Sequence, residues 1–402
     1  MLDSLTTTDM WNDSMRNLIS GIGLTLALLI SNLTYAEDLV EIYELALRND
    51  PGIREAEANK LATLERKPQA RAQWLPQLTG SADWFTSESE RVATGFGTIG
   101  TAGAQISESE QDDWSWSLNL SQALFDKSRW DQLARADKEV AQAEADYQFA
   151  RQDLITRTAE AYFNVLGEQA TLRAVSDAKE AFARQLEQAE RRFEVGLIAI
   201  TDVKESQAAF DDAVATEIAA NRTLANAKEA LREITGEYPQ ELAEPEEGFP
   251  LLPPDPEVEQ DWVDIAMAQN FSLESAKLGA DITRENVGIA RGGHLPTLGL
   301  SGSVGYSESD GETFLPQTGQ TVANSSEVDN NYRVGVQLSV PIYSGGGVSS
   351  EVQEAVYLHR ASRENYEKVA RQTERETRDA YFGVISEISR VQALRRSVES
   401  NQ

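Results

Sequence analysis

The chain has 402 residues, 36 of them basic and 66 acidic, which gives a formal net charge of −30. This excess of carboxylates argues against a nucleic-acid partner, because phosphate binding needs a basic surface. The sequence contains no cysteine, which excludes disulfides, thiol nucleophiles, thiolate metal sites and lipid attachment through cysteine.

The first 36 residues predict export. Residues 1–14 are polar and acidic, and Met15-Arg16-Asn17 is followed by an apolar run over 18–30 and by Thr34-Tyr35-Ala36. This order is typical of a signal peptide. We therefore interpret residues 1–36 as an N-terminal extension and signal peptide, with Met15 as the start codon and cleavage after Ala36. A membrane-anchor helix is the alternative, but the apolar run is short for spanning a bilayer.

Residues 37–236 predict a first structural unit that begins with a helix and continues into a strand pair. Helical patterning covers 38–74, with Pro68 as a late interruption, and residues 81–86 carry strand-like aromatics. Residues 87–112 are polar with few large apolar groups, which predicts an exposed loop.

Residues 114–121 alternate strictly between apolar and polar side chains. The pattern, with heavy aromatics at one end, predicts a strand between lipid and a water-filled lumen. A strand of a soluble sandwich is the alternative, which the predicted export disfavours. The predicted lipid-facing residues of this strand are Trp114, Trp116, Leu118 and Leu120.

A heptad pattern predicts a long antiparallel helical hairpin. The first helix is expected to run from Ser128 to Glu194, about 100 Å at about 1.5 Å per residue, and a return helix follows. Alanines at the companion heptad position let neighbouring helices approach closely, which suits a wall of many packed helices. An ordinary two-stranded coiled coil of a cytosolic protein is the alternative. The alanines are Ala136, Ala143 and Ala150 in the first helix and Ala213, Ala220 and Ala227 in the second.

The bend of this hairpin is predicted within residues 192–203. Gly196 suits a left-handed residue after a helix end, Thr201 is predicted as the N-cap of the return helix, and Asp202 places negative charge at that helix's positive end. The tip over 197–200 is apolar, whereas loops are usually polar. An apolar tip predicts a binding partner.

A Pro- and Glu-rich connector over 237–261 separates the first unit from a second, over 262–402, that repeats it. Leu75-Pro-Gln-Leu recurs at Leu295, Leu-Phe-Asp at 124–126 corresponds to Ile-Tyr-Ser at 342–344, and Ala-Tyr-Phe at 161–163 recurs at 380–382. The chain therefore reads as a tandem duplication. The second unit has alternating strands over 298–306 and 334–340, with a second polar loop predicted over 307–330. The predicted lipid-facing residues of the last strand are Val334, Val336, Leu338 and Val340.

The duplication also predicts a second hairpin tip. Ala161 precedes Gly196 by 35 residues, so the counterpart glycine is expected near position 415. The sequence given reaches Gln402 within a predicted helix. We therefore expect the second unit to be incomplete, without its tip and return helix.

Bilayer physics turns these patterns into an architecture. Four strands cannot close a membrane barrel, for which about eight is the smallest usual number, and open edges in lipid leave backbone groups unpaired. Several chains must then share one barrel, and three copies give twelve strands. The expected fold is an α+β membrane protein whose helical hairpins hang from the barrel as a periplasmic tube, with both polar loops outside the cell.

Four motifs occur together and in order, namely residues 192–203, the paired Leu-Pro-X-Leu sequences, Pro-Ile-Tyr-Ser-Gly-Gly at 341–346 and Ala-Tyr-Phe at 161–163. In this combination the chain resembles the TolC family of outer-membrane efflux channels over residues 38–402. The resemblance implies a homotrimer with a twelve-stranded transmembrane β-barrel and a periplasmic α-barrel. It further implies a periplasmic adaptor and an inner-membrane pump, with which the duct expels drugs or, in type I secretion, proteins.

The resemblance also implies roles for the hairpin tip. Thr201 and Asp202 would hydrogen-bond a Tyr and an Arg near the second hairpin and lock the tunnel closed, although simple helix capping is the other interpretation. The counterparts of those partners fall beyond Gln402. The implied adaptor-docking residues are Val195, Gly196, Leu197, Ile198, Ala199 and Ile200.

The sequence predicts no enzyme, cofactor or metal site. The two histidines, His294 and His359, do not have metal-ligand spacing and are interpreted as structural. Three glycines at 345–347 lack the Lys-Ser/Thr of a phosphate-binding loop, so a junction between strand and helix is the better interpretation. The competing function from another class is a periplasmic or surface coiled-coil scaffold without a pore.

Overall fold

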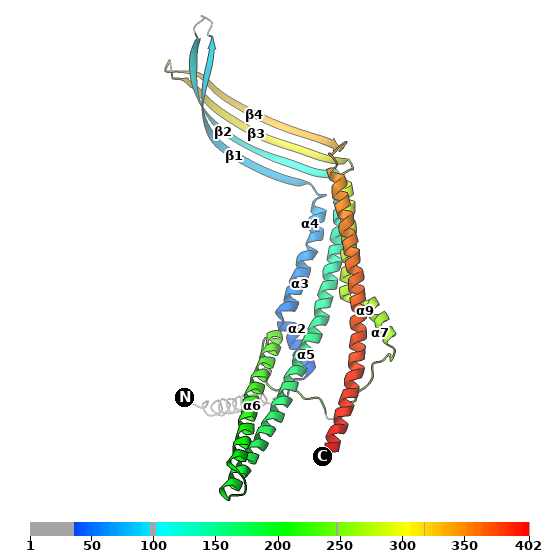
Figure 1. The fold of residues 1–402 in the computed structure, drawn as a ribbon. Helices are drawn as coiled ribbons and strands as arrows, with labels where there is room; N and C mark the ends of the chain where they lie inside the picture. Colours follow the sequence, from blue (N-terminus) through cyan, green and yellow to red (C-terminus); the bar gives the residue numbers. More distant parts are fainter. Residues whose placement is uncertain (1–35, 97–101, 247, 317, 402) are drawn as a thin grey trace, which may run out of the picture. The chain divides into compact units, whose positions relative to one another are not determined.

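The computed structural model describes residues 36–96, 102–246, 248–316 and 318–401, so the predicted signal peptide lies outside the described residues except for Ala36. The chain divides into two compact units, residues 1–55 with 150–251 and residues 56–149 with 252–402. The elements in chain order are α2 (Leu39–Asn49), α3 (Pro51–Leu64), α4 (Arg66–Ala72), β1 (Gln77–Phe96), β2 (Ala102–Phe125), α5 (Lys127–Glu194), α6 (Ile200–Thr235), α7 (Glu259–Gln269), α8 (Phe271–Gly292), β3 (Thr297–Leu315), β4 (Gln320–Ser339) and α9 (Gly347–Asn401) (Figure 1).

The first helical segment is three helices, and its breaks do not fall at Pro68 as predicted. They fall after Asn49 and at Glu65. Asp50 caps α3, since its side chain accepts the Ile53 N–H at 3.1 Å, and Pro51 occupies the first helical position, where no N–H is needed. Pro68 is tolerated because it lies in the first turn of α4.

The long helical hairpin is confirmed. Helix α5 begins one residue before the predicted start and ends at the predicted Glu194, and α6 returns over 36 residues. The heptad pattern marks buried positions, since Leu154 is fully buried and Ala136 is 4% exposed. Three of the predicted seam alanines of α6 are buried as well: Ala213, Ala220 and Ala227.

The first unit has a core in which the start of the connector takes part. Tyr162 of α5 donates its hydroxyl hydrogen bond to the Ala243 carbonyl at 2.6 Å, and the Glu37 carbonyl lies at 3.3 Å. The Glu37 N–H in turn donates to the Glu241 carbonyl at 2.7 Å. Residues 237–243 are thus packed, and α7 already begins at Glu259, within the predicted connector. The core residues are Ile42, Tyr162, Val165, Leu166, Ala227, Leu231 and Leu242.

The second unit contains one antiparallel sheet in the order β1-β2-β3-β4 (Figure 1). The predicted polar loops over 87–112 and 307–330 are wrong, because most of their residues are paired strand. Cross-strand hydrogen bonds use backbone groups, so polar side chains do not end a ladder that apolar residues have started. Val340 lies one residue after the end of β4, not within it.

The element order repeats as predicted. The series of short helices, two strands and one long helix occurs twice, with α7, α8, β3, β4 and α9 following the order of the first unit's elements. One contact repeats as well, because Tyr381 of α9 donates to the Glu257 carbonyl just before α7, as Tyr162 of α5 does to the Glu37 carbonyl before α2.

Candidate functional site

One face of the sheet carries a continuous apolar band across all four strands. Residues directly opposite each other in neighbouring strands share a face, so the register decides which side chains lie together. Trp114 and Tyr306, for example, pack edge to face with their ring centroids 5.5 Å apart. The band comprises Leu78, Ala82, Trp84, Trp114, Trp116, Leu118, Leu120, Leu298, Leu300, Val304, Tyr306, Tyr332, Val334, Val336 and Leu338.

The opposite face of the same strands is polar or small. In β2 it presents Ser115, Ser117, Asn119 and Ser121, and Ser117 forms a 3.0 Å hydrogen bond with Ser81 of β1. The apolar band is seven to nine residues long in each strand, which at about 3.4 Å per residue is roughly 20–30 Å. Bacterial outer-membrane barrels have an apolar outer band of about 25 Å. The dimensions match a lipid-facing surface.

The band is uncovered in a single chain. Tyr332 is 89% exposed, Val334 79% and Trp84 70%. In water such a patch is a liability, since soluble monomers rarely expose a contiguous apolar surface of this kind. Beyond the band the same face turns acidic, with Asp112 opposite Asp310 and Glu110 opposite Glu312.

The sheet has two open edges among the described residues. Strand β1 pairs with β2 alone, and β4 pairs with β3 alone. The outer edges of β1 and β4 therefore present backbone N–H and C=O groups to a further strand.

The hairpin tip, described within the first unit, ends α5 with a Schellman motif. The Leu197 N–H donates to the Arg192 carbonyl and the Gly196 N–H to the Phe193 carbonyl, both at 2.9 Å. Gly196 has a φ of 75°, the left-handed conformation predicted for it.

Thr201 is not the N-cap of α6, contrary to the prediction. The N-cap is Ala199, whose side chain cannot accept a hydrogen bond, and helix α6 begins at Ile200. Asp202, third in the helix, instead accepts the Ala199 N–H at 3.3 Å. Thr201 donates to Asp202 at 3.4 Å. Both side chains are exposed, so they are free for further partners.

The tip presents apolar side chains to solvent. Val195 and Leu197 are each 71% exposed and Ile200 49%, while Ile198 is half-buried. A hollow between α5 and α6 opens beside the tip and is lined by Arg184, Arg192, Ile198 and Asp202, among others. An apolar knob with a charged rim is a plausible docking surface in chemical terms, because its centre gains from desolvation.

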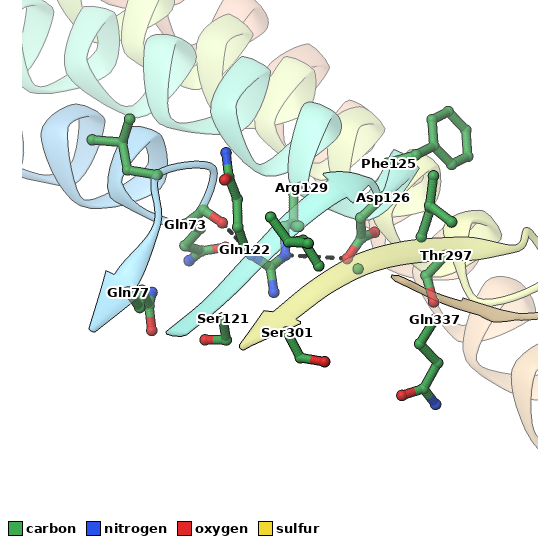
Figure 2. Close-up of a pocket in the computed structure, with 15 residues that line it drawn as sticks. Gln73, Gln77, Ser121, Gln122, Phe125, Asp126, Arg129, Thr297, Ser301 and Gln337 are labelled. Carbon is green, nitrogen blue, oxygen red and sulfur yellow. Dashed lines mark hydrogen bonds and ion pairs between the residues drawn. The ribbon is translucent and has the colours of Figure 1, made fainter. Parts of the chain in front are cut away.

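A third site, at the junction of sheet and helices, was not predicted from the sequence. Figure 2 shows a cavity of about 300 Å³ among β1, β2, β3 and the start of α5. Arg129 donates to the Gln73 carbonyl and pairs with Asp126 at 3.2 Å. Asp126 also accepts the Ser128 N–H at 3.0 Å. This arrangement ties the end of α4 to the start of α5, directly after β2.

No other chemistry emerges from the residues that the structure describes. None of their helices is both long and apolar enough to cross a membrane, and no cluster of three or more His, Asp or Glu side chains among them could hold a metal ion. His359 is a packing residue between α9 and α8, with its Nδ1 3.2 Å from the Thr283 hydroxyl and 3.1 Å from the Ala280 carbonyl.

Comparisons with known proteins agree with this geometry. The family described as "Outer membrane efflux protein" matches residues 42–237 and 262–402. "Outer membrane protein TolC" of Escherichia coli K12 is 36% identical over 385 residues, 95% of this chain and 74% of that protein. "Alkaline protease secretion protein AprF" of Pseudomonas aeruginosa is 30% identical over 393 residues, 96% of this chain and 78% of that protein. The crystal structure of the outer membrane protein VceC from Vibrio cholerae superposes with a TM-score of 0.65 at 20% identity, covering 90% of this chain and 82% of that one.

Proposed function

Because this chain belongs to the outer membrane efflux protein family, we propose that it is the outer-membrane exit duct of an efflux or secretion system. Among its relatives, one is named as a secretion protein and the family as efflux proteins. The duct is a passive conduit for drugs or proteins and carries out no catalytic step. It lies in the outer membrane and extends into the periplasm.

The observation that carries the proposal is the four-stranded sheet with an apolar face and two open edges. An exposed apolar band of bilayer dimensions belongs in lipid, but unpaired strand edges there are costly. Closure by further strands satisfies both requirements. Three copies supply twelve strands, an acceptable even number for an outer-membrane barrel. A homotrimer is therefore the proposed assembly.

The hairpin tip is the proposed docking surface for a periplasmic adaptor, which would link the duct to an inner-membrane pump. Its support is the exposure of Val195, Leu197 and Ile200 on a helical hairpin that is otherwise polar outside. A partner that inserts apolar side chains between these residues would bury surface that water now covers.

Thr201 and Asp202 are the proposed halves of a lock between helices. Their side chains cap α6 only in part, since Thr201 makes its one hydrogen bond to Asp202 at 3.4 Å. Exposed polar groups at the tip are available to pair with a neighbouring hairpin in the closed duct.

Membrane fractionation tests the proposal against its alternative, a coiled-coil scaffold without a pore. The duct is expected in the outer-membrane fraction, soluble only in detergent, as an oligomer whose gel mobility changes on heating. Recovery of the folded protein as a soluble periplasmic species would contradict the duct and favour the scaffold.

A further inference from the structure

The two strand hairpins of the sheet are built in the same register. Leu78 of β1 lies opposite Leu120 of β2. Their counterparts in the repeat, Leu298 of β3 and Leu338 of β4, also lie opposite each other. The repeat relates β1 to β3 by 220 residues and β2 to β4 by 218. Corresponding strands therefore make corresponding pairs.

The two hairpins meet at a joint between β2 and β3. There Leu120 lies opposite Gly302 and Leu118 opposite Val304. Strand β4 is the counterpart of β2, and β1 is the counterpart of β3, yet the matching edges of β4 and β1 are open. The sheet thus contains one half of each side of a second joint of the same kind.

We propose that β4 pairs with β1 of a second copy in the register of the β2–β3 joint. This inference rests on the shared barrel proposed above and specifies its contact. Applying the repeat to the observed pairs places Leu338 opposite Ala82 of the second copy. It likewise places Val336 opposite Trp84 and Val334 opposite Thr86 of the second copy.

This register keeps one apolar face around the assembly. A slip by one residue would turn every side chain of β4 to the wrong face, so only slips by two residues compete. One such slip brings Val334 opposite Glu88, and the opposite slip brings Val328 opposite Glu90. Both slips set an apolar side chain against a carboxylate, which the proposed register avoids.

The exposed valines in the polar parts of the strands fit the same register. Val92 of β1 is 57% exposed and Val328 of β4 is 52% exposed, although the residues around them are polar. The proposed pairing places them directly opposite each other. At the equivalent level of the β2–β3 joint, Glu110 faces Glu312, and like charges directly opposite are unfavourable. The contact between copies therefore has the better complementarity of the two joints.

Disulfide trapping tests the register, because the chain has no cysteine of its own. The variant that joins Asn331→Cys with Ser89→Cys places the thiols in the proposed pair. Pairing Asn331→Cys with Ser87→Cys or with Arg91→Cys tests the two competing slips. Directly opposed residues have Cα atoms about 4.5–5.5 Å apart, whereas diagonal neighbours at about 7–8 Å exceed the disulfide limit of about 7 Å.

The sheet itself offers a matched control. Asp113 and Ser309 occupy the same place in the β2–β3 joint and are directly paired, so cysteines there should form a bridge within one chain. Within a chain, β1 and β4 are separated by two strands, about 14 Å at about 4.8 Å per step. A bridge between Asn331→Cys and Ser89→Cys must therefore join two copies. Ser339→Cys with Ser81→Cys, whose internal counterpart is the pair Ser121 and Ser301, repeats the test at the other end.

Mild oxidation of outer membranes, followed by non-reducing electrophoresis, distinguishes the outcomes. Covalent dimers and trimers are expected from the proposed pair at about ten times the yield of either slipped pair, since only the former meets the disulfide distance. Higher yield from a slipped pair would overturn the register and leave the shared barrel standing. If the internal control bridges but no pair links two copies at either end, both the register and the shared barrel are refuted.

Discussion

At the residue scale, two glycines decide how closely α8 approaches the start of α5. A Cβ on Gly288 would lie 2.8 Å from the Asp131 carboxylate, and one on Gly292 would lie 2.1 Å from the Ser128 hydroxyl and 3.0 Å from its backbone nitrogen. The Ser128 hydroxyl in turn donates to the Ile289 carbonyl at 3.1 Å. Side-chain size at these positions therefore sets the spacing of the two helices.

Gly292→Ala is expected to destabilise the protein by about 1–3 kcal/mol, the usual cost of overpacking a tight contact. Denaturant unfolding of the detergent-extracted protein, followed by circular dichroism, measures this loss. Gly383→Ala in α9 is the matched control, because nothing lies within 4 Å of its added Cβ. That variant should be neutral or slightly stabilising, since alanine favours helix over glycine. Equal destabilisation by both variants would refute the packing argument.

Tyr162 holds the connector against α5 through its hydroxyl. The ring is 3% exposed, and burial raises the pKa of Tyr162, so the hydroxyl remains a hydrogen-bond donor. Tyr162→Phe would leave the Ala243 carbonyl without this donor and should cost about 1–3 kcal/mol in the free energy of unfolding. Tyr381→Phe, in the corresponding but half-buried site, should cost less because water replaces the lost bond. The same unfolding assay checks the pair, and a larger loss at Tyr381 would contradict the explanation.

At the element scale, β2 offers a direct comparison of the two faces of the sheet. Leu118 belongs to the apolar band and Ser117 to the polar face, one residue away along the strand. Leu118→Arg would place a charge against lipid, at a cost of about 2–4 kcal/mol near the bilayer midplane. Ser117→Arg would place it in the wet interior. The first variant should lower the amount of assembled protein in the outer membrane, and the second should not. Equal yields would argue against a lipid-facing band.

The α5–α6 hairpin carries an ion pair whose strength depends on pH. Lys179 donates to both carboxylate oxygens of Glu217, each at 2.6 Å, and this hydrogen bond lowers the pKa of Glu217. A carboxyl with a lowered folded-state pKa stabilises the fold above its unfolded pKa, about 4.3. The contribution is lost as the pH falls through the folded value.

Glu217→Gln is therefore expected to lower the melting temperature at neutral pH and to match the parent protein in acid. Melting curves by circular dichroism between pH 3 and pH 7, flagged here as about the range that spans carboxyl titration, check this. Glu205→Gln, at an exposed site on the same helix, is the control and should track the parent at every pH. A constant difference between Glu217→Gln and the parent would contradict the assignment.

The sequence predicts those elements whose side chains repeat with a clear period. The heptads locate α5 almost to the residue, and the alternation at 114–121 identifies the lipid-facing side of β2. It does not predict how far the strands continue, because over 102–112 the pairing depends on backbone groups and on a register set by the apolar half. It also misses the bond from Arg129 to Gln73, since nothing local links residues so far apart. Thr201 shows the limit of capping rules, because Asp202 supplies the helix start from inside the helix.

At the scale of the whole molecule, the hairpin tip is expected to affect partner binding without affecting assembly. Leu197→Asp replaces a 71% exposed side chain, so folding and trimer yield should be unchanged. Affinity for a purified periplasmic adaptor should fall about tenfold or more, as for the loss of an interface anchor. Ile218→Asp, at a 65% exposed site on α6 away from the tip, is the control. If both variants bind alike in surface plasmon resonance, the tip is not the docking surface.

The common register of the two hairpins has a consequence for symmetry. A ring of three chains holds six hairpins that are nearly alike in shape, so the barrel is close to sixfold although the protein is only threefold. Any single substitution recurs at every second hairpin and leaves the hairpins between them untouched. Gene duplication thus lets the wall of the barrel vary in an alternating pattern, with two independent sequences facing the same lipid.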